Sequence, residues 1–217
     1  MVTTGVVGLL GLLTWFVIDQ TERSLTPLSN KVSVRLQNLW EIAQSGMQEK
    51  KYLRAEKALL TILKLDKTNA AAYNRLGILY SRQKEYKDAI ECFEIASSIS
   101  PTASSLHNLG LIYFETENYE KAGQAFESAL KLEDSLAARH IAYAKVQEKL
   151  GNTAQTVTAL ETAIKLEPSV QSLKLLADAY EQAGETDKAS SIRQRVKRRE
   201  VSTTAPKRIK RPRRVTF

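Results

Sequence analysis

The sequence has little of what most active sites are built from. Cys92 is the only cysteine among 217 residues, which excludes an internal disulfide and a site built from several thiolates. His107 and His140 are the only histidines, and neither lies in a spacing typical of zinc ligands. A Gly-rich phosphate loop and a G-x-S-x-G element are also missing from the sequence. We therefore expect neither an enzyme nor a bound metal or cofactor.

Proline and glycine are scarce, and the excess of positive charge is confined to the carboxyl-terminal end. Five prolines, nine glycines and 43% apolar residues argue against general disorder. The net charge of +8 comes entirely from residues 197–217, where nine Lys and Arg face the single Glu200. We predict that this segment is a disordered tail that binds anionic lipid headgroups, an acidic partner or nucleic-acid phosphates, or is simply solvated. Its candidate polyanion-binding residues are Lys207, Arg208, Lys210, Arg211, Arg213 and Arg214.

The amino terminus holds an apolar run, residues 2–18, that carries no charge. A length of 17 residues is at the lower limit for crossing a hydrocarbon core of ~30 Å. We predict a membrane anchor in residues 1–18, with a signal peptide or a buried helix as alternatives, and a linker in residues 19–35. Because basic residues follow the run, we expect a single-pass membrane protein whose remaining residues lie in the cytoplasm. The alternative is that these residues lie outside the cytoplasm.

The remaining sequence repeats itself. Leu-Gly-x-x-Tyr occurs at Leu76 to Tyr80 and again, 33 residues later, at Leu109 to Tyr113. Each copy is followed by small and aromatic residues at fixed intervals, and these are Ala89, Phe93, Ala96 and Pro101 after the first and Ala122, Phe126 and Ala129 after the second. This pattern resembles the tetratricopeptide repeat, a pair of antiparallel helices that buries its apolar face by stacking on its neighbours.

The resemblance implies an all-α fold, a right-handed superhelix of about five repeats within residues 36–196. The expected repeats are 36–69, 70–102, 103–136, 137–169 and 170–196. In the last one Arg193 occupies the place of the large aromatic residue, which is typical of a terminal unit with a polar outer face.

The resemblance also implies a protein-interaction scaffold or adaptor that binds a partner peptide or helix in the concave groove lined by the first helix of each repeat. The first-helix residues expected to face the groove are Trp40, Asn74, Ile78, Arg82, His107, Asn108, Leu111, Phe114, Ile141 and Lys145. Exposed aromatic and aliphatic side chains among them would form a binding patch. The alternative is that some are packing residues assigned one helical step out of place. Two other functions stay open: a membrane-tethered contact of the basic tail with nucleic acid or the ribosome, and an assembly factor of a cell envelope or export machine.

Overall fold

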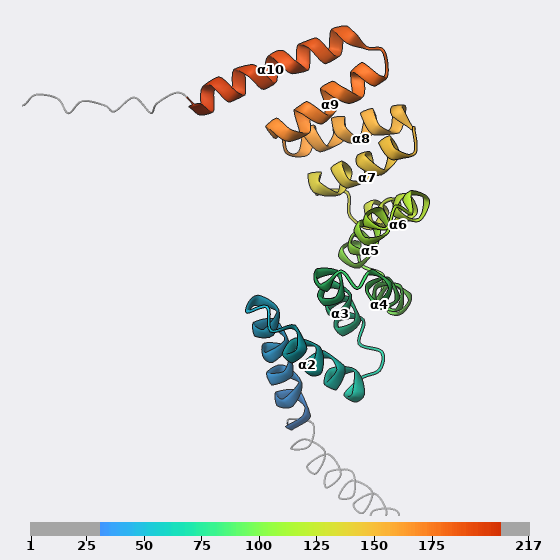
Figure 1. Cartoon of the computed structure of the whole chain (residues 1–217), viewed down its shortest axis with the longest axis vertical. Coiled ribbons are helices and arrows are strands. Elements are labelled where there is room, and N and C mark those ends of the chain that lie inside the picture. The colour runs from blue at the N-terminus through green and yellow to red at the C-terminus, as the bar shows by residue number, and fades with distance from the viewer. Residues whose placement is uncertain (1–30, 205–217) are drawn as a thin grey trace, which may run out of the picture.

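The computed structural model describes residues 31–204, and within that range the chain consists of helices joined by short turns (Figure 1). The first of these helices covers residues 31–48. The others are α2 (Tyr52–Leu65), α3 (Ala70–Gln83), α4 (Tyr86–Ile99), α5 (Ala103–Glu115), α6 (Tyr119–Leu132), α7 (Ala137–Lys149), α8 (Thr153–Leu166), α9 (Val170–Gln182) and α10 (Thr186–Thr204).

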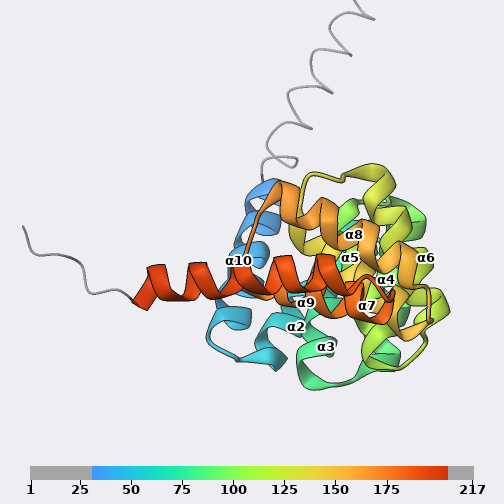
Figure 2. The ribbon, with the colours of Figure 1, turned by 90° about the horizontal axis from the view of Figure 1, so that it is seen from above.

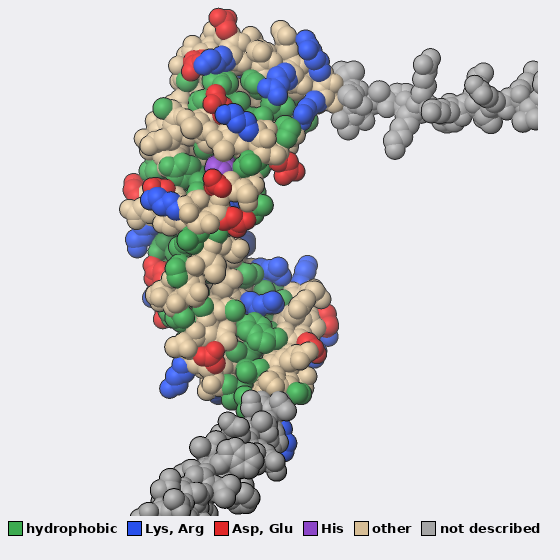
Figure 3. Space-filling view, turned by 180° about the vertical axis from the view of Figure 1, so that it is seen from behind, with side chains coloured by type: hydrophobic (Ala, Val, Ile, Leu, Met, Phe, Trp, Pro, Cys, Tyr) green, Lys and Arg blue, Asp and Glu red, His purple; other side chains and the backbone are tan. Residues whose placement is uncertain are grey.

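The helices pack in sequential pairs. The most extensive contacts join α3 to α4, α5 to α6, α7 to α8 and α9 to α10, and each pair then stacks on the next through α4–α5, α6–α7 and α8–α9. Helix α3 also contacts α5, and α5 contacts α7, so these first helices form the inner row of the array. The stack is bowed, with a hollow along one edge (Figure 3). This architecture confirms the predicted all-α superhelix; the exact bounds of its repeats stay a prediction.

The repeated glycine is explained by the aromatic ring opposite it. A Cβ atom on Gly77 would lie 2.7 Å from the ring of Phe93, and one on Gly110 would lie 2.9 Å from the ring of Phe126. Both phenylalanines are almost completely buried. The first helix of each pair therefore carries glycine where the ring of the second helix presses against its backbone.

A second repeated feature ties each helix pair to the one before it. The hydroxyl of Tyr80 on α3 donates a hydrogen bond of 2.9 Å to Glu56 on α2. Tyr113 on α5 donates in the same way to Glu94 on α4, and Tyr180 on α9 donates to Glu161 on α8. The corresponding residue of α7 is Gln147, which instead accepts a hydrogen bond from Asn152. The junction between α6 and α7 is thus built differently from its neighbours.

Helix α10 closes the array with a polar outer surface. Arg193, at the position expected for an aromatic residue, forms ion pairs with Asp178 and Glu181 on α9. The helix continues to Thr204, so residues 197–204, which the sequence assigned to a disordered tail, are helical. Helix-breaking proline first appears at Pro206, which explains why the basic stretch before it remains helical. The end of α10 projects beyond the stacked helices (Figure 2).

The predicted single-pass membrane location is wrong by the criterion of helix length and polarity. Between residues 31 and 204, no helix has a stretch that is both apolar and long enough to cross a bilayer. Most of these helices have 13 or 14 residues, whereas a span needs ~20 apolar ones. Residues 2–18, on which the prediction of an anchor depended, lie outside the part of the chain that the structure describes.

Candidate functional site

One pocket brings together half of the residues predicted to face the groove. It has a volume of about 270 Å³ and lies between the inner helices α5 and α7, above α6. The predicted residues that line it are His107, Leu111, Phe114, Ile141 and Lys145, and Glu115, Phe126, Ala138 and Ala142 complete it. Ligand sites for small molecules usually occupy ~300–1,000 Å³, so this pocket has the size for one large side chain of a partner.

The floor of the pocket is aromatic and its rim is charged. The ring of Phe126 is 1% exposed, and the ring of Phe114 packs edge-on against Tyr119 with 5.5 Å between centroids. Leu111 is 40% exposed at the edge of the pocket, while Lys145 is exposed on α7. A side chain entering the pocket would therefore exchange water for apolar contacts below and meet one cation near the opening.

His107 is a half-buried polar group in this pocket. Its ring lies 5.3 Å, centroid to centroid, from the ring of Phe126. Burial, and then the positive charge of Arg139, lower the pKa of His107 below its ordinary value of 6.5, so the ring is neutral near pH 7. Its Nδ1 atom is buried and has no hydrogen-bond partner among the described residues.

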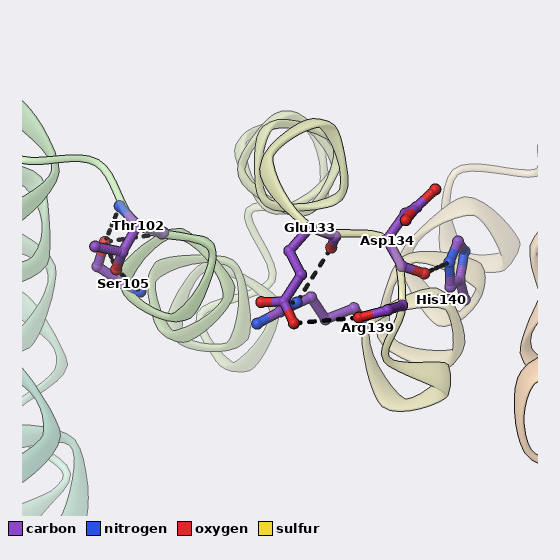
Figure 4. A network of polar contacts seen from close by, with 7 residues as sticks. Thr102, Ser105, Glu133, Asp134, Arg139 and His140 are labelled. Atoms are coloured by element: carbon purple, nitrogen blue, oxygen red, sulfur yellow. Dashed lines mark hydrogen bonds and ion pairs between the residues drawn. The ribbon is translucent and has the colours of Figure 1, made fainter.

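Arg139, which the sequence analysis did not identify, holds the α6–α7 junction in place (Figure 4). Its side chain is 5% exposed, and Nη1 lies 2.8 Å from the carboxylate of Glu133 and 3.1 Å from the backbone oxygen of Glu133. His140 Nε2 lies 2.8 Å from the backbone oxygen of Asp134 in the same linker. Helices α5 and α7 begin differently. Helix α5 has a capping box, in which Thr102 and Ser105 form hydrogen bonds with each other. Helix α7 is preceded by Leu136, whose side chain cannot cap it. Arg139 and His140 therefore fix the linker between α6 and α7 through its backbone oxygens and the carboxylate of Glu133.

The other predicted groove residues lie on α3, on the helix before α2 and, in the case of Asn108, on α5, and several already have partners. Asn108 donates to Asn74 at 3.4 Å, which links α5 to α3. Trp40 lies beneath the guanidinium of Arg75, 5.3 Å from the ring centroid. Two further residues complete the set: Arg82 donates to the backbone oxygen of Met47 at 3.3 Å, and Ile78 packs partly buried against the central core. None of these five residues lines the pocket at His107, and their role in a groove stays a prediction.

Two predicted properties of the chain are not decided by this geometry. No group of three or more potential metal ligands occurs among residues 31–200, and the expected absence of catalysis and cofactors stays a prediction. The candidate polyanion-binding residues from Lys207 to Arg214 lie outside the described residues, so their ligand also stays a prediction.

Comparison with protein families identifies the repeat. Residues 58–91 and 142–192 match models of the tetratricopeptide repeat. Residues 82–163 match a model described as subunit 3 of the anaphase-promoting complex, or cyclosome. The chain is therefore an α-solenoid of tetratricopeptide repeats. This fold supports a role as a protein-interaction scaffold.

Solved structures of the protein MamA have the same fold. One of them has a TM-score of 0.73 and 20% sequence identity to this chain. The matched region includes 81% of this chain and 97% of the MamA chain. A fragment of MamA from Desulfovibrio magneticus RS-1 gives a TM-score of 0.72 at 14% identity, covering 79% of this chain and 98% of its own. Identities this low establish the fold alone. No curated protein matches the chain significantly in sequence.

Proposed function

We propose that the chain is an adaptor that binds a peptide or helix of a partner protein in the concave groove along α3, α5 and α7. The observation that carries this proposal is the pocket of about 270 Å³ on the inner row of helices. Its aromatic floor and exposed Leu111 provide the kind of apolar anchor point that dominates binding energy in protein interfaces. A partner would insert one large side chain there and extend along Asn74 and Ile78 of α3.

His107 adds a polar requirement to this site. Because its buried Nδ1 has no acceptor nearby for a hydrogen in the part of the chain that the structure describes, we assign the proton of the neutral ring to Nε2. No hydrogen bond within the described residues engages Nε2. A carbonyl or carboxylate of the partner would accept from Nε2, which favours a polar backbone or side-chain group beside the inserted residue.

The test is a selection of displayed random peptides on the full-length chain, followed by affinity measurements of the enriched peptides. Leu111→Asp and Lys145→Glu change exposed groove residues, so both variants should fold as the wild type does. Leu166→Asp and Lys165→Glu make the same changes at exposed positions near the end of α8 and serve as matched controls. We expect the groove variants to weaken binding at least about tenfold, equivalent to ~1.4 kcal/mol, and the controls to leave it unchanged. Equal binding by all four variants would remove the groove as the site.

A further inference from the structure

A second surface lies on the outer helix α2, away from the groove. Four residues spaced four, three and four apart share one exposed face of this helix, and we call them the α2 ridge: Leu53, Lys57, Leu60 and Lys64. Leu53 is 64% exposed and Leu60 is 42% exposed. Two leucines that protrude from the same helical face leave apolar surface uncovered, and such surfaces mark contacts with partners.

A groove runs along each side of the ridge. The first, of about 420 Å³, lies between α2 and the helix before it and is lined mainly by Leu39, Ile42, Leu53 and Ala58. The second, of about 530 Å³, lies between α2 and α4 and has Leu60, Leu63, Tyr73 and Ile95 among its walls. Both exceed the pocket at His107 in volume. Side chains of a partner could therefore straddle the ridge and fill both hollows.

The charges around the ridge are mostly positive. Arg54 and Lys57 line the first groove, and Lys64 and Lys67 line the second. None of these four residues forms an ion pair within residues 31–200. The nearby Glu56 is occupied as the acceptor of the Tyr80 hydroxyl. Residues 1–196 are neutral as a whole, so this excess of cations on α2 and in the turn after it is a local feature.

We propose that the α2 ridge binds an amphipathic helix of a partner protein whose apolar residues fill the two grooves and whose acidic residues face Arg54, Lys57 and Lys64. An apolar stripe seated in hollows beside a helix is a common mode of peptide recognition, and charge complementarity then fixes the partner. Asp88 and Glu91 line the α4 side of the second groove, so the helix presents neutral or basic residues on that side. This asymmetry determines which side of the bound helix carries its acidic residues.

The hollows favour a protein helix over an anionic lipid surface, which would offer the same negative charge. A flat layer of headgroups would contact the tips of Leu53 and Leu60 and leave both grooves empty. A helix can place side chains in each groove and keep its acids within reach of the ridge lysines. The site is separate from the groove of α3, α5 and α7, so the two proposals can fail independently.

The experiment selects displayed helical peptides on the full-length chain and discards those that also bind the double variant Lys57→Glu/Lys64→Glu. The peptides that remain depend on the ridge. We expect them to carry apolar residues at helical spacing with acidic residues beside them, and to lose affinity at least about tenfold for the double variant. Leu53→Ser should weaken the same peptides. The matched control Lys165→Glu on α8 and the groove variant Leu111→Asp should not.

All of these substitutions are at exposed positions, and thermal unfolding of each variant is the check that the fold is intact. Three results would overturn the proposal: no peptide that depends on the ridge, ridge-dependent peptides that are neutral or basic, or a ridge that binds vesicles containing anionic lipid while rejecting acidic peptides. Peptides that bind only the groove would contradict the ridge and leave the adaptor function standing. Peptides that bind only the ridge would contradict the groove proposal and support the ridge.

Discussion

Two buried glycines should respond to alanine in opposite directions. Gly77 lies in α3 and Gly123 in α6, and both are interior helical positions, where alanine is ~1 kcal/mol more favourable than glycine. At Gly77 the new methyl group would lie 2.7 Å from the ring of Phe93, which is 1% exposed and cannot move into solvent. Overpacking of this kind costs ~1–3 kcal/mol. The net effect of Gly77→Ala is then a loss of up to about 2 kcal/mol in the free energy of unfolding.

At Gly123 the nearest atom to the added methyl group is Cγ1 of Val146 at 3.5 Å, an ordinary van der Waals distance. The propensity gain then remains, and Gly123→Ala should stabilise the array by up to about 1 kcal/mol. Urea unfolding followed by far-ultraviolet circular dichroism measures both variants. The double variant Gly77→Ala/Phe93→Leu should be more stable than the sum of the two single effects predicts, because the smaller side chain makes room. If Gly77→Ala stabilises as much as Gly123→Ala does, the ring yields without cost and our explanation of the repeated glycine is wrong.

Three further predictions concern charge. Glu133→Ala should destabilise the array by about 2 kcal/mol because it leaves the buried guanidinium of Arg139 without its carboxylate, whereas Arg139→Met should be nearly neutral; chemical unfolding that gave the opposite order would contradict this. Because the pKa of His107 is lowered in the folded state, the unfolded chain binds this proton first, so stability should fall as the pH drops below 6.5, and His107→Gln should reduce that fall in melts taken across this range. Burial and the bond to Glu161 raise the pKa of Tyr180 from 10.0 to about 12, so stability should fall as the pH rises through that interval, and Tyr180→Phe should make alkaline unfolding less steep.

The sequence was sufficient for the fold because the residues that pack one helix on another recur at nearly constant spacing. The same contact between glycine and an aromatic ring occurs twice, at Gly77 with Phe93 and at Gly110 with Phe126. Two occurrences are enough to align the other helices of the array to the repeat. The presence of Arg193 where the repeat has an aromatic residue likewise predicted a polar outer surface at the end of the array. In the structure, Arg193 forms ion pairs with residues of α9 on that surface.

The sequence was insufficient for the site because the decisive interactions occur once. Arg139 lies at a position that the repeat does not mark, and its burial depends on how the linker at Glu133 folds back over it. The state of His107 depends in turn on this guanidinium and on a ring from the next helix. Periodicity placed His107 on the correct helix but carried no information about neighbours contributed by α6 and α7.

The division between repeated and unrepeated residues also indicates where specificity lies. Relative to the glycine or alanine at the helix contact, Asn74, His107 and Ile141 occupy the same position in α3, α5 and α7, three residues before Gly77, Gly110 and Ala144. The side chain at this position therefore changes from an amide in α3 to an imidazole in α5 and an aliphatic group in α7, while the residues that pack the helices together stay nearly the same. The framework cannot distinguish one partner from another, since every unit supplies the same contacts. If the proposed groove binds a partner, discrimination would come from this variable row, in which the ring of His107 lies 5.3 Å, centroid to centroid, from the buried ring of Phe126.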